Sequence, residues 1–362
     1  MLKDNALKVF IFGLVLCLTL ACGRSHADNI EAPYPASTAI SNIAFDWDTH
    51  IRQAPGSDNW IMTWASDGHQ YSAWGDGGGF KGTNRKGRVS LGVARIEGDK
   101  DAYVGVNVWG GQDAENPATA EGKSYGLISI EGILYMWVSP GSNAQGYRES
   151  RLYQSNDQGA SWAAADWAFE QSDGLIFPTF IQYGQDYQGA RDEYVYIYAN
   201  YLKEDTKLAV QKPGEIALMR VSKTGILDRS QYAFFSGVNE DGDPIWSPEL
   251  ERRSPAFTDQ NGVGWTTSVS YNPALQRYFL MTEHDKTFES NLGIFDAPEP
   301  WGPWTTVLYD RLNTDDIEQT AFFYNFANKW LSEDGKNFVL VFTGIKSNDS
   351  WNTVEGRFET SQ

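Results

Sequence analysis

The sequence predicts an all-β fold, and three observations lead to that prediction. Short strand-like runs recur along the chain, at 59–64, 70–74, 88–96, 125–130 and 133–138 among others. Clusters of Gly, Asn and Asp separate these runs, as is typical of turns. Helical periodicity and helix-length gaps are absent beyond the N-terminal segment, which excludes an α/β crossover architecture.

The N-terminal segment has the features of an export signal. Lys3 and Lys8 precede an apolar run at 9–21, which is short for a permanent membrane span. Residues 1–27 are therefore predicted to be a signal peptide. The residues that end at Cys22 resemble a lipobox, whereas cleavage at the end of the segment would release a soluble protein. We expect a secreted protein, or one lipid-anchored at the cell envelope, in the periplasm or at the outer membrane.

The remaining chain is predicted to be one domain. Residues 28–44 are expected to be an extended lead-in, and residues 45–362 a single catalytic domain without a linker. Cys17 and Cys22 are the only cysteines, so the mature domain has neither a disulfide nor a thiolate metal site. Its stability must come from a large core, which 14 Trp, 18 Tyr and 19 Phe can supply.

The charge balance restricts the partners. The formal net charge is −18, and nucleic acid binding needs a basic surface, so no nucleic acid partner is expected. Membrane contact is expected only through an N-terminal lipid anchor, and the protein is expected to be a monomer. No cofactor is required by the sequence. The Asp-rich turns leave a structural calcium ion open, although no EF-hand loop is present.

One turn motif distinguishes a propeller from a sandwich or a jelly roll. Residues 155–162 read SNDQGASW and match the Asp-box, S-x-D-x-G-x-x-W, of sialidase-like propeller blades. In this turn Asp157 can accept backbone N–H bonds, Gly159 can take a left-handed conformation and Trp162 can pack into the blade. A weaker echo lies at 332–338. Although Asp-x-Gly turns occur in many β proteins, the motif favours a β-propeller of antiparallel blades, with room for about five to seven of them.

The segment 64–80 is the first candidate for chemistry. It contains aromatic residues, His69 and three consecutive glycines, which would let a ligand approach the backbone closely. His69 is either a general base or a simple turn residue. The following segment, 77–96, contains no acidic residue but five cations, Lys81, Arg85, Lys86, Arg88 and Arg95. These cations either attract an anion or form surface ion pairs.

Two further segments combine aromatic and polar residues. Residues 122–126 (GKSYG) precede a hairpin that places Tyr135 and Arg151 on neighbouring strands, and residues 183–194 form a polar-aromatic loop. Sugar-binding channels use such combinations, because pyranose faces stack on rings and hydroxyl groups need polar partners. Many of these rings must instead belong to the core.

Several segments together resemble a known group of proteins. These are SDNWIMTWASDGHQYSAWGDGGGF, GRVSLGVARIEG, GKSYG, LYMWVSPGS, SNDQGASW, DYQGARDEYVY and APEPWGPWTTV. They resemble bacterial extracellular propeller proteins that include ulvan lyases and a related uncharacterised family containing glycoside hydrolases. The resemblance extends from about Asn59 to the C-terminus. It implies a seven-bladed propeller that cleaves a sulfated, uronate-containing polysaccharide by β-elimination.

The resemblance also implies four catalytic residues. Similar lyases use two histidines about twenty residues apart and a Tyr and an Arg sixteen apart. Here His50 and His69 are nineteen apart, and Tyr135 and Arg151 are sixteen apart. Elimination requires neutralisation of the uronate carboxylate, a task that suits the guanidinium fork of Arg151. His69 and Tyr135 would share the roles of base and acid. The expected substrate-binding residues are Lys123, Tyr125, Arg191, Tyr187, Arg85 and Arg88.

Two other functions remain open from the sequence. A glycoside hydrolase on the same fold would use paired carboxylates such as Asp67, Asp76 or Asp192. A non-catalytic surface protein would use its aromatic rings to bind glycans. A lyase produces an unsaturated uronate that absorbs ultraviolet light, a hydrolase produces only new reducing ends, and a binding protein produces neither.

Overall fold

The computed structural model describes residues 30–141, 148–203, 209–312, 320–346 and 348–361. The predicted signal peptide, residues 1–27 with Cys17 and Cys22, lies outside the described residues. Residues Ala32–Gln362 form one unit. None of its described helices has the length and apolarity that a membrane crossing requires.

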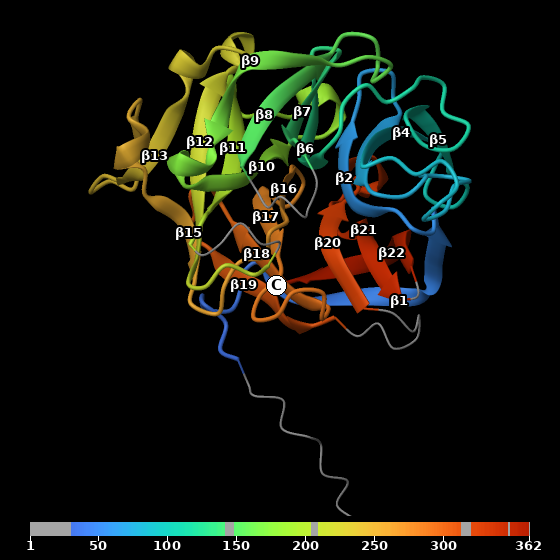
Figure 1. Ribbon diagram of the computed structural model, residues 1–362. Helices are drawn as coiled ribbons and strands as arrows, with labels where there is room; N and C mark the ends of the chain where they lie inside the picture. Colours follow the sequence, from blue (N-terminus) through green and yellow to red (C-terminus); the bar gives the residue numbers. More distant parts are fainter. Residues whose placement is uncertain (1–29, 142–147, 204–208, 313–319, 347, 362) are drawn as a thin grey trace, which may run out of the picture. The chain divides into compact units, whose positions relative to one another are not determined.

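The described strands form four sheets, and the largest divides at its only parallel pair, β10 with β16, into two antiparallel parts; we call the five antiparallel units blades 1 to 5 (Figure 1). Blade 1 contains β2 (Asp58–Trp64), β3 (Gln70–Gly75), β4 (Leu91–Glu97) and β5 (Val104–Trp109). Blade 2 contains β6 (Lys123–Ile130), β7 (Ile133–Ser139), β8 (Glu149–Ser155) and β9 (Ala163–Glu170). Blade 3 contains β10 (Leu175–Gln182), β11 (Tyr194–Tyr201), β12 (Gly214–Ser222), β13 (Ala233–Val238) and β14 (Pro244–Ser247), and β15 (Pro255–Asp259) pairs with β12.

Blade 4 contains β16 (Thr267–Asn272), β17 (Arg277–Thr282), β18 (Asn291–Ala297) and β19 (Thr305–Arg311). Blade 5 contains β20 (Thr320–Phe326), β21 (Asn337–Lys346), β22 (Asn348–Thr360) and β1 (Ile40–Gln53). Short 3-10 turns connect some strands, namely η2 (Gln171–Asp173), η3 (Gln185–Tyr187), η4 (Lys223–Gly225), η5 (Arg229–Gln231), η6 (Leu250–Arg252) and η8 (Asn328–Trp330). The all-β propeller prediction agrees with this arrangement, but seven blades are not confirmed, because the described strands make five.

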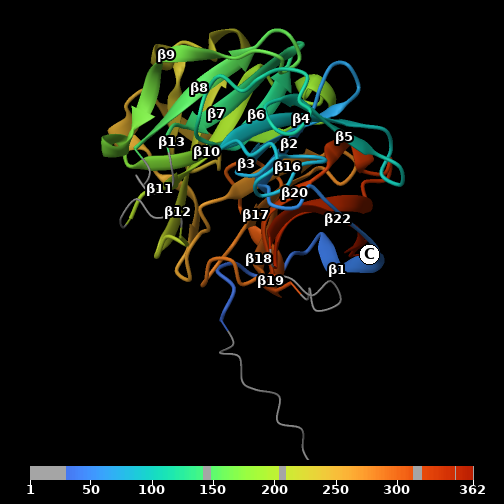
Figure 2. The ribbon, with the colours of Figure 1, turned by 45° about the vertical axis from the view of Figure 1, so that its right-hand side comes forward.

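The last blade joins the two ends of the unit. The N-terminal strand β1 pairs antiparallel with β22, from Ile40 opposite Thr360 to Gln53 opposite Trp351 (Figure 2). Residues 40–44, expected in the lead-in, therefore belong to this strand. A strand from one end of the chain completes a sheet from the other end, so the ring is closed by hydrogen bonds rather than by a disulfide.

One edge strand of each blade follows the central axis, and these five inner strands, β2, β6, β10, β16 and β20, run in the same direction (Figure 1). β10 and β16 pair in parallel over two residues, and side chains link other inner strands, as where Asn325 Nδ2 donates to Trp60 O at 2.7 Å. β6 and β10 are buried along their whole length, because neighbouring blades cover both faces. We call the ring end where these strands begin the Asp58 end, and the opposite one the Trp64 end.

The Asp-box prediction is confirmed at the turn between β8 and β9. Asp157 Oδ1 accepts a bond from Ser161 N at 2.9 Å, and Gly159 has φ of +85°. Trp162 Nε1 donates to Gly159 O at 3.1 Å. The echo at 332–338 has a similar bond, from Lys336 N to Asp334 Oδ1 at 3.0 Å. The local sequence is enough to build these turns, because all their bonds are short-range.

Inner strands are irregular close to the Asp58 end. The ladder between β2 and β3 shifts register after Asp58, and Asn59 has φ of +58°. Phe177 of β10 and Phe323 of β20 also have positive φ, +55° and +50°, at similar register shifts. Bulges and left-handed non-glycine residues cluster at functional sites, where they redirect side chains. This end of the ring is therefore where a site is expected.

Candidate active site

A cluster of charged side chains lies at the Asp58 end, between blades 1, 2 and 5. We call Asp58, Asp76, Lys123, Arg88 and Asp349 the charged cluster. Lys123 Nζ lies 2.6 Å from Asp76 Oδ1, and Arg88 lies 3.1 Å from Asp76 Oδ2. The Lys123 side chain is only 5% exposed, and Asp76 is 27% exposed. Asp76 is thus a carboxylate held by two cations at a surface that solvent reaches.

Backbone geometry brings Asp58 beside this ion pair. Asp58 is opposite Gly75 in the β2–β3 ladder, and Asp76 follows Gly75 directly with φ of +51°. A Cβ atom on Gly75 would lie 2.7 Å from Asp58 Oδ1 and 2.7 Å from Lys123 Cδ. Only glycine leaves room for these two side chains.

The carboxyl groups of the cluster have different electrostatic environments. Asp58 is partly exposed, but its Oδ1 is buried and makes no hydrogen bond among the described residues. Burial raises the pKa of Asp58 well above its usual range, against the opposing effect of Lys123. Burial, followed by the nearby charge of Asp76, also raises the pKa of Asp349. Asp58, whose pKa is raised by burial, therefore lies near the ion-paired Asp76, and such a difference in environment separates the acid from the base in many enzymes.

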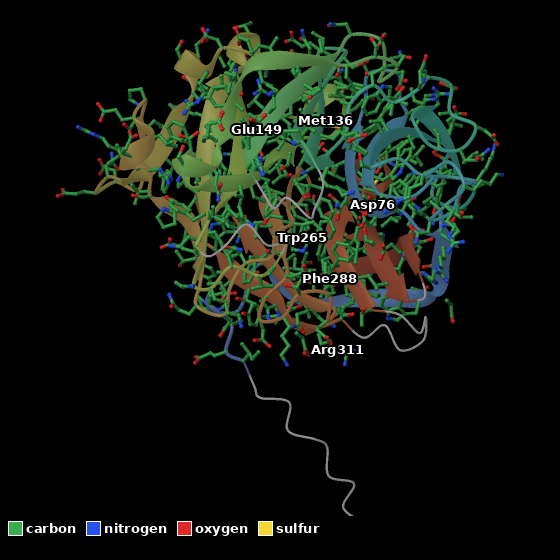
Figure 3. All side chains as sticks on the ribbon, viewed as in Figure 1. Asp76, Met136, Glu149, Trp265, Phe288 and Arg311 are labelled. Atoms are coloured by element: carbon green, nitrogen blue, oxygen red, sulfur yellow. The ribbon has the colours of Figure 1, made fainter. Side chains whose placement is uncertain are left out.

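Aromatic residues fill the axis next to the charged cluster. Tyr125 packs edge-on against Phe177 at 4.4 Å and against Trp265 at 5.7 Å. Trp265 in turn stacks on Phe322 at 5.5 Å. Phe288 contacts both of the latter rings and is 38% exposed, whereas the others are buried. Figure 3 marks Trp265 and Phe288 in the middle of the ring and Asp76 toward blade 1.

A second group of unusual side chains lies in blade 4. Glu283 follows β17 and is fully buried; its Oε1 accepts a bond from Phe288 N at 2.9 Å, and its Oε2 has no partner among the described residues. Burial raises its pKa to about 8. The neighbouring His284 stacks on Tyr309 at 3.8 Å, and burial lowers its pKa to about 4. Both groups are therefore neutral near pH 7.

The four residues expected to catalyse elimination do not meet. His69 is in the turn after β2, at the Trp64 end, where its backbone N–H donates to Asp67 Oδ1 at 2.9 Å. Arg151 is opposite Val138, which is opposite Ser124 at the start of β6, so Arg151 is near the Asp58 end. The length of the inner strands separates His69 from Arg151, and one monosaccharide cannot reach both.

Tyr135 and His50 are also in separate places. Tyr135 is 6% exposed and packs in the cluster that contains Trp137, whereas Arg151 is opposite Val138 and so points to the other face of blade 2. Arg151 pairs with Glu149 at 3.0 Å. His50 lies on β1, the outermost strand of blade 5, where it bonds Asn352 at 2.8 Å. The expected convergence of these residues is therefore not found.

The expected substrate-binding residues divide between the two ends of the ring. Lys123 and Arg88 belong to the charged cluster. Tyr125 belongs to the group of aromatic side chains beside it. Arg85 is exposed in the loop between β3 and β4. Two of the expected substrate-binding residues lie at the Trp64 end. Tyr187 is buried and its hydroxyl donates to Tyr194 O at 3.0 Å. Arg191 forms an ion pair with Glu299 at 2.9 Å.

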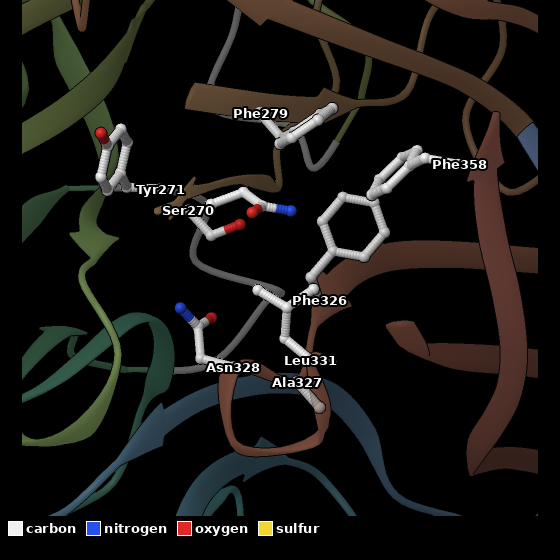
Figure 4. Close-up of a pocket in the computed structure, with 9 residues that line it drawn as sticks. Ser270, Tyr271, Phe279, Phe326, Ala327, Asn328, Leu331 and Phe358 are labelled. Atoms are coloured by element: carbon white, nitrogen blue, oxygen red, sulfur yellow. The ribbon is translucent and has the colours of Figure 1, made fainter. Parts of the chain in front are cut away.

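The Trp64 end has a pocket of its own. It has a volume of about 460 Å³ and is lined by residues that include Trp64, Tyr183, Tyr271, Asn328 and Glu333. An adjoining cavity between blades 4 and 5, with a volume of about 10 Å³, has room for no more than a water molecule (Figure 4). The described lining of the pocket contains a single carboxyl group, Glu333, so the Asp58 end is the better candidate for acid–base chemistry.

The described residues do not indicate a metal site. No group of three or more His, Cys, Asp or Glu side chains among them is placed to hold a metal ion. The structural calcium ion that the sequence left open stays untested.

Sequence reasoning missed Asp58 and Asp349. Asp58 lies within the first of the segments that resemble the propeller proteins. The sequence shows neither the burial of the Asp58 side chain nor the residues that surround it. Asp349 lies in the β21–β22 hairpin, nearly three hundred residues from Asp58 along the chain. Asp76 was named among the possible hydrolase carboxylates. Of the others, Asp67 is bonded within the His69 turn, and Asp192 accepts from Tyr194 N and Tyr196 O–H.

Comparisons with known proteins give a family and a fold. A family model described as "Domain of unknown function (DUF4185)" matches residues 126–337, more than half of the chain. No curated protein matches the sequence. Among solved structures, a GH43 β-xylosidase/α-arabinofuranosidase from a compost microbial metagenome has a TM-score of 0.50 at 13% identity, covering 85% of this chain and 95% of that one.

Two other solved structures have slightly lower TM-scores. The catalytic domain of a GH62 α-L-arabinofuranosidase from Coprinopsis cinerea has a TM-score of 0.49 at 11% identity, with 85% of this chain and 98% of that chain covered. A GH43_1 enzyme from Xanthomonas citri has a TM-score of 0.48 at 13% identity, with 85% and 91% covered. At such identities the likeness concerns the fold alone.

Proposed function

The chain belongs to the DUF4185 family, and from this premise we propose that it is a glycoside hydrolase that cleaves an extracellular polysaccharide with Asp58 and Asp76. The observation that carries the proposal is the pairing of two neighbouring carboxyl groups in opposite electrostatic environments. Burial raises the pKa of Asp58 well above its usual range, whereas Asp76 forms ion pairs with Lys123 and Arg88. Glycoside hydrolysis needs one carboxyl group of each kind beside the scissile bond.

The two residues have separate roles in this mechanism. Asp58 gives its proton to the glycosidic oxygen as the bond from that oxygen to the anomeric carbon breaks. Asp76, on the solvent-accessible side of the pair, accepts a proton from the water molecule whose oxygen forms the new bond to the anomeric carbon. Lys123 positions Asp76 through their ion pair, and Gly75, which has no side chain, leaves room for Asp58 Oδ1 beside Lys123.

Two considerations favour hydrolysis over elimination. The residues expected for elimination are spread over both ends of the ring, so no groove combines His69 with Arg151. The solved structure of like fold with the TM-score of 0.50 is a β-xylosidase/α-arabinofuranosidase, and glycoside hydrolysis was already open from the sequence.

Incubation with a panel of neutral and acidic polysaccharides tests the proposal. We expect new reducing ends without the ultraviolet absorbance of unsaturated uronates. Asp58→Asn and Asp76→Asn should each lower the rate by about 100-fold or more while the variants stay folded. Asp67→Asn, in the turn at the Trp64 end, should keep its rate. Formation of double bonds, full activity in both cluster variants, or binding without any cleavage would each refute the proposal.

A further inference from the structure

We infer that the loop between β3 and β4 is a subsite for an anionic substituent of the polysaccharide, a sulfate ester or a carboxylate. This inference rests on the proposed function, because it assigns a substrate class to the same site. We call residues 81–88 the cationic loop. It carries Lys81, Arg85, Lys86 and Arg88, all of them exposed.

The charge of the loop is unusual for this chain. The formal net charge is −18, yet residues 77–96 contain no acidic side chain. Arg88 pairs with Asp76, but Lys81, Arg85 and Lys86 form no ion pair with the described residues. Three cations without carboxylate partners create a local positive potential, which attracts anions to a molecule that elsewhere repels them.

The chain is anchored by hydrogen bonds directly before the cationic loop. The side-chain amide of Asn107 donates to Gly78 O, Phe80 O and Gln112 O at 2.8–3.1 Å, and its oxygen accepts from Phe80 N at 3.0 Å. The Phe80 ring packs against Trp60 at 5.5 Å in the core. Cations on a fixed backbone lose less conformational entropy on binding than cations on a flexible loop.

The loop adjoins the proposed catalytic carboxylates. Arg88 contacts Asp76 Oδ2 on one side and donates to Asn84 O at 3.2 Å on the other. Asn84 in turn lies against Gly56, whose N–H donates to Asp349 O at 2.5 Å. In a polysaccharide bound at Asp58 and Asp76, a neighbouring sugar unit would thus lie within reach of the cationic loop.

Affinity electrophoresis with dextran sulfate, carboxymethyl dextran and unmodified dextran tests the inference. These polymers share a backbone, and the two charged forms separate sulfate from carboxylate recognition. We expect retardation by one or both charged polymers and none by dextran. The variant Lys81→Ala/Arg85→Ala/Lys86→Ala should bind about 10-fold more weakly, since exposed ion pairs contribute modestly one by one. Raising the ionic strength from about 0.01 M to about 0.15 M should weaken wild-type binding.

A charge-matched variant provides the control. Arg252→Ala/Lys329→Ala/Lys336→Ala removes the same charge from other blades and should bind as the wild type does. Equal loss in both triple variants, equal binding of dextran, or stronger binding of a single-stranded oligonucleotide would overturn the inference. Asp58→Asn should lose hydrolysis but retain binding. A wild-type protein that binds the charged polymers but cleaves no polysaccharide would count against the proposed function and not against the subsite.

Discussion

Lys123 of blade 2 reaches across the blade boundary, and its Nζ lies 2.6 Å from Oδ1 of Asp76 in blade 1. The ammonium group also donates to Ser90 O at 3.0 Å, so a nearly buried cation is satisfied by groups from blade 1. The bond ties the start of the inner strand β6 to the β3–β4 connection of blade 1 at the Asp58 end. It also holds the Asp76 carboxylate close to Asp58.

Replacing Lys123 by Met should therefore affect both stability and activity. Loss of one partner of a buried ion pair costs several kcal/mol, but Asp76 is 27% exposed and keeps Arg88, so we expect about 2 kcal/mol. Urea unfolding measures this change. Lys100→Met, which removes exposed pairs to Asp101 and Glu355, should cost under about 1 kcal/mol. Equal losses in the free energy of unfolding for Lys123→Met and Lys100→Met would contradict a buried ion pair between Lys123 and Asp76.

Glu283 should make stability depend on pH. Its pKa is about 8 in the folded protein and lower in the unfolded chain, so the folded state binds this proton more tightly. The contribution is fully present below the unfolded pKa and is lost as the pH rises to about 8, with a total on the order of 4 kcal/mol. Glu283→Gln should lack this loss.

Comparing the stability of wild type with that of Glu283→Gln at several pH values isolates the contribution of Glu283. The contributions of His284 and the other titrating groups are the same in both proteins and cancel in the difference. Chemical denaturation between about pH 4.5 and about pH 8.5 is the measurement. The exposed Glu333→Gln serves as the control and should follow the wild type throughout. A stability difference between wild type and Glu283→Gln that stays constant with pH would contradict the burial of a carboxyl group whose Oε2 has no partner among the described residues.

Gly75→Ala should disturb the charged cluster directly. The added methyl group would lie 2.7 Å from both Asp58 Oδ1 and Lys123 Cδ, closer than van der Waals contact permits. Because small displacements of catalytic groups are costly, we expect kcat/KM to fall by about 10-fold to 100-fold. Gly184→Ala, where no atom lies within 4 Å, should change stability through its φ of +76° but leave kcat/KM unchanged. A similar rate loss in both would point to general destabilisation.

Asn107→Ala should release the cationic loop. The substitution leaves four backbone groups without their side-chain partner, and we expect a loss of about 3 kcal/mol. Hydrogen exchange at the amide of Phe80 should become faster by about 100-fold, as roughly 2.7 kcal/mol of protection corresponds to that factor. Asn116→Ala, which loses one side-chain bond to Val108 O, is the matched control. Unchanged exchange at Phe80 would contradict the role of Asn107 as the anchor.

The sequence predicted those features that depend on neighbouring residues. The Asp-box at 155–162 and the strand at 125–130 were recognised because turn bonds and burial patterns are local. Lys123 and Arg88 were both expected to bind substrate, and both lie in the charged cluster. Spacing along the chain misled in the cases of His69 and Arg151, because equal intervals do not determine which end of a blade a residue occupies.

The amino-acid sequence by itself determined the strands, the turns and the positive loop in an acidic chain, since these follow from the properties of contiguous residues. The tertiary structure decided the number of blades in the described residues, the closure of β1 on β22 and the meeting of Asp58, Asp76 and Asp349. Burial of a carboxyl group arises from atoms distant in the chain. Only the closed ring therefore raises the pKa of Asp58 and creates an acid beside a carboxylate.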